Sequence, residues 1–143
     1  MTTDTRTATT TAATSADTDV VRAVFQAFAG GDLAALGDLF HPGATWHHRN
    51  DDRLGGVHRG SGAIAAYLAE AAQLTAGTLR VVPQSYMADG QGRVSVLVRL
   101  SATRPGGRSM DGPQIVLFTL DRGRVRSIDQ FVGDPSAVAA FWA

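Results

Sequence analysis

The stretch FHPGATWHHR, Phe40–Arg49, decides the fold of this chain, together with the glycine-rich step GGVHRG at residues 55–60. The residues from Ala44 to His48 favour an extended backbone, in which side chains two positions apart point to the same side of a sheet. Trp46 and His48 therefore share one face, and His47 points away. Because imidazole exchanges protons near neutral pH, the pattern predicts a proton-transfer group beside an aromatic wall.

Helices are predicted on both sides of this strand, because apolar residues recur there at the spacing of one buried stripe. The first helix begins at Thr18 and stops at Gly30-Gly31, and the second begins after Asp32 and stops before Pro42-Gly43. Asp32 is a good N-cap. A polar loop is predicted over Arg49–Gly60, followed by a third helix from about Gly62 to Ala76 with Ser61 as its cap.

The rest of the chain alternates β-prone runs with turns. The predicted strands are Thr78–Ala88, Arg93–Arg104, Ser109–Leu120 and Val125–Val132, and Pro135 begins a short terminal helix. Pro83 predicts an edge strand or a bulge, because proline cannot donate to a sheet ladder. The predicted class is α+β: a cone of three helices on one face of a strongly curved, mainly antiparallel sheet.

Length and composition set the limits of the function. A chain of 143 residues with 44% hydrophobic residues builds one core, and we expect one domain over Thr18–Ala143 behind a disordered Thr/Ala-rich tail, Met1–Asp17. Thirteen basic residues balance thirteen acidic ones, so no nucleic acid or membrane partner is expected. No residue is cysteine and no apolar run is long enough to span a bilayer. A cytoplasmic location fits these features.

Several motifs together resemble the SnoaL-like members of the nuclear transport factor 2-like superfamily. They are Gly31-Asp32-Leu33, Phe40-His41-Pro42, Trp46-His47, the step from Gly55 to Gly60, and the end from Asp134-Pro135 to Phe141-Trp142-Ala143. That superfamily also contains ketosteroid isomerases, limonene epoxide hydrolases and polyketide cyclases. The resemblance covers Thr18–Ala143. It implies the cone fold and, since apolar residues occupy both sheet faces, a homodimer through the uncovered face.

The resemblance also implies a proton-transfer position. His48 lies where ketosteroid isomerases carry the carboxylate that moves the proton. Val116 and Phe25 or Phe28 lie where those isomerases carry their oxyanion-hole donors, and none of them can donate, so ketosteroid isomerisation itself is not expected. Arg99 lies on a strand that could reach a cavity, but the residue set of the epoxide hydrolases is incomplete.

Asp129 is the predicted partner of His48. Strand alternation groups Ser127, Asp129 and Phe131 on one face, and in many SnoaL-like chains that face lines the cavity. A carboxylate there would form an acid–base pair with His48. The alternative is a β-bulge that inverts the alternation, which would leave Asp129 in solvent and Ile128 buried.

Further side chains form either an ordinary core or the lining of a ligand cavity. The predicted substrate-binding set is Trp46, Phe25, Phe28, Tyr67, Tyr86, Arg99, Val116, Phe118 and Phe131. His48 itself is either functional or a structural histidine. His41 reads as a surface residue, and His58 as a residue that bonds its own loop. Their spacing fits no metal-ligand motif, so we expect no metal and no cofactor.

Two classes of function follow. The first is a cofactor-free acid–base enzyme, an isomerase, cyclase or hydrolase, acting on a small and largely apolar metabolite such as a polyketide or terpenoid. The second is a non-catalytic module with the same fold that binds a small ligand or dimerises. A polar pair deep in the cavity would favour the enzyme, and an all-apolar or collapsed interior would favour the module.

Overall fold

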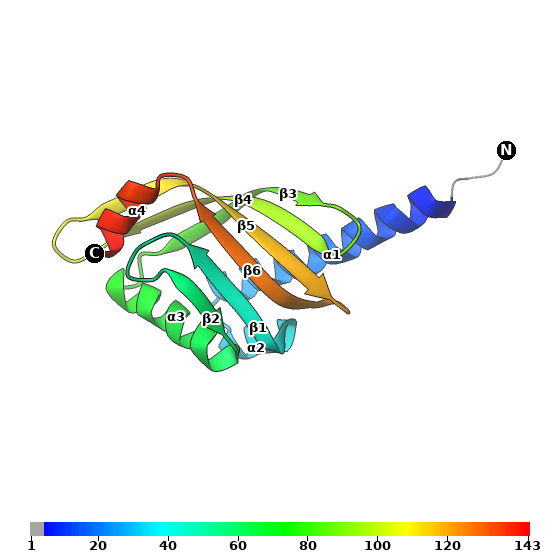
Figure 1. The fold of residues 1–143 in the computed structure, drawn as a ribbon, viewed down its shortest axis with the longest axis horizontal. Helices are drawn as coiled ribbons and strands as arrows, with labels where there is room; N and C mark the ends of the chain where they lie inside the picture. Colours follow the sequence, from blue (N-terminus) through cyan, green and yellow to red (C-terminus); the bar gives the residue numbers. More distant parts are fainter. Residues whose placement is uncertain (1–4) are drawn as a thin grey trace.

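A six-stranded sheet in the order β2-β1-β6-β5-β4-β3 forms the body of the molecule, as seen in a computed structural model that describes residues 5–143 (Figure 1). The strands are β1 (Phe40–Arg49), β2 (Gly56–Arg59), β3 (Arg80–Ala88), β4 (Arg93–Thr103), β5 (Ser109–Asp121) and β6 (Arg124–Val132). β1 and β6 pair in parallel, and the other pairs are antiparallel. The predicted α+β class and mainly antiparallel sheet are confirmed.

Three helices lie against one face of this sheet, and a fourth closes one end of it (Figure 1). They are α1 (Thr5–Ala29), α2 (Leu33–Leu39), α3 (Ser61–Leu74) and the terminal α4 (Pro135–Trp142). Asp32 caps α2 as predicted, because its side chain accepts a hydrogen bond from the backbone N–H of Ala35. The cap predicted at Ser61 is wrong: Gly60 occupies that position, at a φ of 86° that favours glycine. No helix in the described part of the chain is long and apolar enough to cross a membrane.

The main core lies between the helices and the inner face of the sheet. Val94, Val96 and Val98 alternate along β4 and are fully buried against residues of α1 such as Val21. Each such valine contributes roughly 1.5–3 kcal/mol to stability by leaving water. The strand pattern of the sequence therefore identifies the core face of β4 directly.

Strand pairing is irregular between Phe40 and Thr45, where β1 pairs with β6, and at two further places. The first of these two lies between Pro83 and Ser85 on the edge strand β3, which confirms the edge or bulge position predicted for that proline. The second lies where Ser127 and Val125 of β6 pair with consecutive residues of β5. An extra residue in one strand reverses the side-chain alternation beyond it. As a result Val125 and Ile128 both face the core.

A short strand occupies part of the predicted loop. β2 pairs antiparallel with β1, so the expectation of an unbroken loop over residues 49–60 is wrong. The chain turns tightly before β2, and a Cβ atom on Gly55 would collide with the carbonyl oxygen of Asn50. The glycine pair at Gly55-Gly56 therefore makes room for a compact loop beside the inner face of β1.

Helix α1 begins earlier than the sequence predicts. It starts at Thr5, within the segment expected to be a disordered tail, whose first residues, Met1–Asp4, lie outside the described part. Alanine favours the helix, and threonine can bond back along it, as Thr18 Oγ1 does to the carbonyl oxygen of Thr14 at 2.7 Å. This end of α1 projects past the sheet (Figure 1).

The division of the chain into a tail and a domain stays a prediction. A helical turn without tertiary packing is marginal in water, so we expect the backbone amides of the projecting turns of α1 to exchange within the dead time of a hydrogen-exchange experiment. The amides of Val20–Ala29, which pack on the sheet, should be protected. Equal and strong protection along the whole of α1 would contradict the predicted tail.

Candidate functional site

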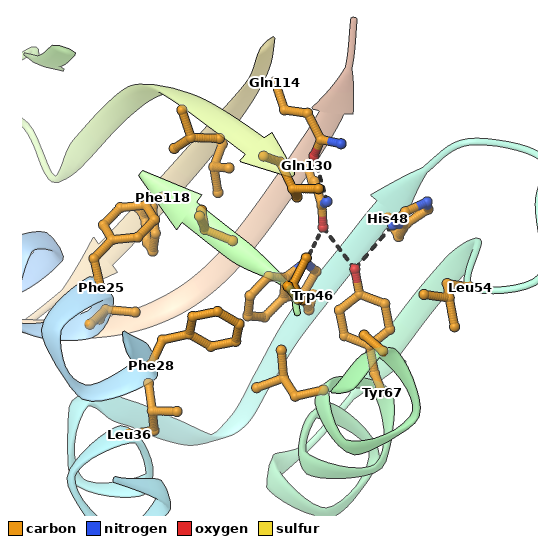
Figure 2. A pocket seen from close by; sticks show the side chains of 18 of the residues that line it. Phe25, Phe28, Leu36, Trp46, His48, Leu54, Tyr67, Gln114, Phe118 and Gln130 are labelled. Carbon is orange, nitrogen blue, oxygen red and sulfur yellow. Dashed lines mark hydrogen bonds between the residues drawn. The ribbon is translucent and has the colours of Figure 1, made fainter. Parts of the chain in front are cut away.

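A cavity of about 70 Å³ lies between the helices and the inner face of the sheet. Its apolar lining comes from every layer: Val24, Phe25, Phe28, Leu36, Leu54, Leu68, Ala71, Leu79, Val81, Val98, Leu100, Val116, Phe118 and Trp142. Five side chains with polar atoms complete it, and Figure 2 shows them gathered at one side: Trp46, His48, Tyr67, Gln114 and Gln130. The cavity is therefore a hydrocarbon chamber with one polar corner.

Strand register brings the polar corner together. His48 of β1 pairs with Gln130 of β6 in the parallel ladder, and Gln130 pairs with Val116 of β5, two residues from Gln114. Trp46 precedes His48 by two residues and therefore shares its face. Tyr67 reaches the same point from α3, with its hydroxyl between the side chains of His48 and Gln130 (Figure 2).

His48 forms a buried pair with Asp52. The imidazole Nε2 lies 2.9 Å from Oδ2 of Asp52, and the two side chains are 1% and 0% exposed. Asp52 also accepts hydrogen bonds from Asn50 Nδ2 at 2.7 Å and from the backbone N–H of Leu54 at 2.8 Å. The compact loop before β2 thus holds a carboxylate against the inner end of β1.

Hydrogen bonds continue from His48 across the cavity. Its Nδ1 lies 3.0 Å from the hydroxyl of Tyr67, which donates to Gln130 Oε1 at 2.8 Å. Trp46 Nε1 donates to the same oxygen at 3.0 Å, and Gln130 Nε2 donates to Gln114 Oε1 at 2.7 Å. We call the series Asp52, His48, Tyr67, Gln130 and Gln114 the polar chain. It runs from a carboxylate at one end to an amide at the other.

The polar chain is almost fully satisfied from within. In the part that the structure describes, no buried side-chain nitrogen or oxygen lacks a hydrogen-bond partner. Burial, and then the charge of Asp52, raise the pKa of Tyr67 well above its ordinary value, so this hydroxyl keeps its proton. Gln114 Nε2 makes no hydrogen bond to a described residue, so it is not one of the fully buried atoms, although Gln114 as a whole is 4% exposed. That amide nitrogen is the donor that remains available to a ligand.

Most of the predicted lining is found in the cavity. His48, Trp46 and Tyr67 lie at its polar corner, and Phe25, Phe28, Val116 and Phe118 lie along its apolar part. The rings of Phe25 and Phe118 meet edge to face with centroids 5.6 Å apart. These positions follow from the helical stripe of α1 and from the alternation of β1 and β5.

Asp129 is not the partner of His48, and the prediction that it enters the cavity is wrong. It lies on the outer face of the sheet, where Oδ1 accepts from Arg49 Nε at 2.9 Å and lies 3.7 Å from His47 Nδ1. The bulge in β6 is the reason, because it turns Ile128 and Gln130 inward and Asp129 outward. This arrangement is the alternative that the sequence left open.

Three predicted lining residues also lie elsewhere. Phe131 follows Asp129 on the outer face and lies beneath the Arg49 guanidinium, 5.3 Å from the ring centroid. Arg99 is exposed and pairs with Asp111 at 2.8 Å. Tyr86 lies outside the cavity lining. Its ring packs against Phe25 and beneath the guanidinium of Arg22, both residues of α1.

The sequence also hides three members of the site. Asp52 lies in a run of polar residues that reads as a solvated loop, and its spacing of four from His48 is the one signal for it. Gln130 and Gln114 look like ordinary polar residues of strands. Their alternation with Ile128 and Val116 shows that they share the core face once the bulge in β6 is known.

The other two histidines have structural roles. His58 Nε2 lies 3.0 Å from the carbonyl oxygen of Leu54, which confirms that it bonds its own loop, and its ring stacks on Tyr67 with centroids 4.3 Å apart. His41 Nε2 lies 2.8 Å from the carbonyl oxygen of Asp121 at the surface. His58 thus supports the ring of Tyr67 from behind.

Comparison with known proteins gives one family and a consistent fold. Residues 21–128 match the SnoaL-like domain family. An uncharacterized protein of Mycobacterium tuberculosis is 36% identical over 128 residues, which are 90% of this chain and 97% of that protein. Bal32a, from a soil-derived mobile gene cassette, superposes with a TM-score of 0.88 at 30% identity, over 92% of this chain and 99% of its own.

A more distant structure shows the same fold. A protein of Catenulispora acidiphila with a ketosteroid isomerase-like fold, solved in complex with trimethylamine, superposes with a TM-score of 0.70 at 20% identity. The match covers 86% of this chain and 91% of that one. The cone implied by the motifs of the sequence is therefore shared with solved structures along most of its length.

Proposed function

Because this chain belongs to the family of SnoaL-like domains, we propose that it is a cofactor-free acid–base enzyme that isomerises, cyclises or hydrolyses a small, largely apolar metabolite. The observation that supports the proposal is the buried pair of His48 and Asp52 at the polar corner of an apolar cavity. A histidine oriented by a carboxylate is the arrangement with which proteins move protons near neutral pH.

The burial of His48 and Asp52 supports a catalytic role for this pair over a purely structural one. Removing two ionisable side chains from water is costly, and an apolar pair of the same size would pack the core without that cost. Electrostatic interactions are stronger in a site from which water is excluded. A proton donor placed there therefore interacts more strongly with a bound substrate. The polar chain thus has the features of a preorganised site, which an ordinary core lacks.

The lining supports the class of substrate. Hydrocarbon and aromatic side chains surround the chamber and match the chemistry of an apolar skeleton such as that of a polyketide or terpenoid, and the cavity of about 70 Å³ must widen to admit one. The available amide nitrogen of Gln114 adds a requirement for an oxygen that accepts a hydrogen bond. A carbonyl, hydroxyl or ether oxygen at that point would orient the substrate toward Tyr67 and His48.

The test is a turnover screen with a matched binding measurement. Purified protein is incubated with small polyketides, terpenoid ketones and epoxides, and products are followed by mass spectrometry. Binding is followed by the quenching of tryptophan fluorescence, since both Trp46 and Trp142 line the cavity. Conversion that requires native protein supports the enzyme. Compounds that bind without conversion across the panel favour the alternative, a ligand-binding module, and would overturn the proposal.

We further expect a homodimer through the outer face of the sheet. Leu97, Ile115, Leu117 and Phe131 form an apolar patch there, on the face opposite to α1, α2 and α3. Light scattering at micromolar concentration should give twice the monomer mass of 15.0 kDa. Ile115→Arg should give a folded monomer, because Ile115 lies between Leu97 and Phe131 in the strand register and a charge at the centre of the patch opposes burial. A wild-type mass of one chain would contradict the expectation.

A further inference from the structure

We infer that the indole of Trp46 sets the direction of every hydrogen bond in the polar chain and thereby fixes His48 as an imidazolium, paired to the Asp52 carboxylate, in the resting protein. The inference deepens the proposed function, since it states which way the site moves a proton. Its evidence is the set of donors and acceptors alone, and it can be tested without a substrate.

The direction is set at Trp46. An indole N–H can donate and cannot accept, so the atom 3.0 Å from Trp46 Nε1 must be the amide oxygen of Gln130. This fixes an orientation that is otherwise ambiguous for a glutamine side chain. The amide nitrogen of Gln130 then faces Gln114 Oε1 at 2.7 Å, as donor to acceptor.

Tyr67 must donate to the same oxygen. A carbonyl oxygen carries no proton, so the 2.8 Å contact between the Tyr67 hydroxyl and Gln130 Oε1 uses the proton of the tyrosine. The raised pKa of Tyr67 means that this proton stays in place. The hydroxyl then presents a lone pair to His48 Nδ1 at 3.0 Å. Nδ1 of His48 therefore carries a proton.

The other nitrogen of His48 must also carry a proton. Nε2 lies 2.9 Å from Asp52 Oδ2, and this carboxylate already accepts from Asn50 Nδ2 and from the backbone N–H of Leu54. Several donors directed at one carboxylate favour its anionic form. An anionic acceptor requires an N–H from the ring, and a neutral imidazole has one N–H, not two. His48 is thus a cation held by a buried anion.

The other titratable groups near the polar chain do not change the number of protons on His48. His58 stacks on the ring of Tyr67, and its Nε2 lies 3.0 Å from the carbonyl oxygen of Leu54. Arg53 and Glu70, from the same loop and from α3, pair with each other at the surface. Neither group offers a donor or acceptor to His48, so the balance stays between Asp52, His48 and Tyr67.

The consequence for the reaction is that the resting site is an acid. When a substrate oxygen replaces Gln130 Oε1 at the Tyr67 hydroxyl, the O–H bond of Tyr67 breaks toward that oxygen as the Nδ1–H bond of His48 breaks toward Tyr67. The substrate gains one proton, Tyr67 is unchanged, and His48 becomes neutral with Nε2–H still bonded to Asp52. Such a step favours the opening or loss of an oxygen function over the removal of a carbon-bound proton.

The test is nitrogen-15 NMR of the histidine rings at pH 7. In the wild type we expect both ring nitrogens of His48 to show one-bond coupling to hydrogen. In Trp46→Phe no donor fixes the orientation of the side-chain amides of Gln130 and Gln114, so both can rotate. The Tyr67 hydroxyl can then donate its proton to His48 Nδ1, and we expect His48 to lose the proton on that nitrogen. Gln130→Met should give the same loss by another route, because Tyr67 no longer has its acceptor.

Trp142→Phe is the matched control, since it removes an indole that lines the same cavity but makes no hydrogen bond to the polar chain. It should keep both protons on His48. An unprotonated His48 nitrogen in the wild type would overturn the inference. Two retained protons in both Trp46→Phe and Gln130→Met would overturn it as well. Absent turnover with every compound would refute the enzyme and leave this NMR result untouched.

Discussion

Replacing His48 with glutamine is expected to lower kcat by roughly 10²–10⁴-fold, the usual loss when a positioned proton-transfer group is removed. Glutamine can still bond Tyr67 and Asp52, so the buried partners keep hydrogen bonds, but its amide cannot exchange a proton near neutral pH. KM should change little, because the lining that holds the apolar skeleton is intact. Steady-state kinetics on the compound identified in the turnover screen would measure both constants.

His47→Gln is the control for this substitution. His47 is the neighbouring residue on the same strand, and its ring faces the outer surface beside Asp129. Its replacement makes the same change of residue type at the adjacent position and should leave kcat within a factor of about two, which is less than about 0.5 kcal/mol. A folded His48→Gln protein with the kcat of the wild type would rule out His48 as the proton-transfer residue.

The second large effect concerns stability. Asp52→Ala should lower the free energy of unfolding by roughly 3–5 kcal/mol, because removing one partner of a buried pair leaves the other charge without compensation. The backbone N–H of Leu54 loses its side-chain acceptor in the same step, and Asn50 Nδ2 keeps only the carbonyl oxygen of Pro135. Urea unfolding followed by tryptophan fluorescence would show a lower midpoint at an unchanged slope.

Asp51→Ala is the matched substitution for the stability measurement. Asp51 is exposed and belongs to the same loop, so its loss should change the free energy of unfolding by less than about 0.5 kcal/mol. Equal and small effects for Asp51→Ala and Asp52→Ala would mean that the loop carboxylate does not hold His48. The comparison separates the buried pair from any general effect of loop charge.

The sequence predicts the fold well where a local pattern decides the structure. The alternation of Val94, Val96 and Val98 marks the inner face of β4, and Asp32 begins α2 as a capping side chain should. Trp46 and His48 enter the cavity because the period of a strand places them together. In each case one short segment carries the whole signal, and distant contacts do not alter it.

The missed parts depend on one-residue changes of register and on distant contacts. A bulge in β6 exchanges the faces of Asp129 and Gln130, and composition alone does not locate such a bulge. Asp52 is buried because the loop folds back over β1, and within its run of polar residues only the spacing of four from His48 points to it. Helix α1 begins at Thr5 and not at Thr18 because alanine-rich sequence favours a helix even without apolar anchors, while the predicted tail itself stays a prediction.

The origin of the cavity lining has a consequence for engineering. α1 and α2 supply hydrocarbon side chains to the chamber, among them Phe25, Phe28 and Leu36, whereas the acid–base groups come from β1, the loop behind it, β6 and α3. The part of the chamber wall that α1 and α2 supply is thus encoded apart from the residues of the polar chain. A combinatorial library at Phe25, Phe28 and Leu36 would reshape the chamber for new skeletons while the polar chain keeps its sequence.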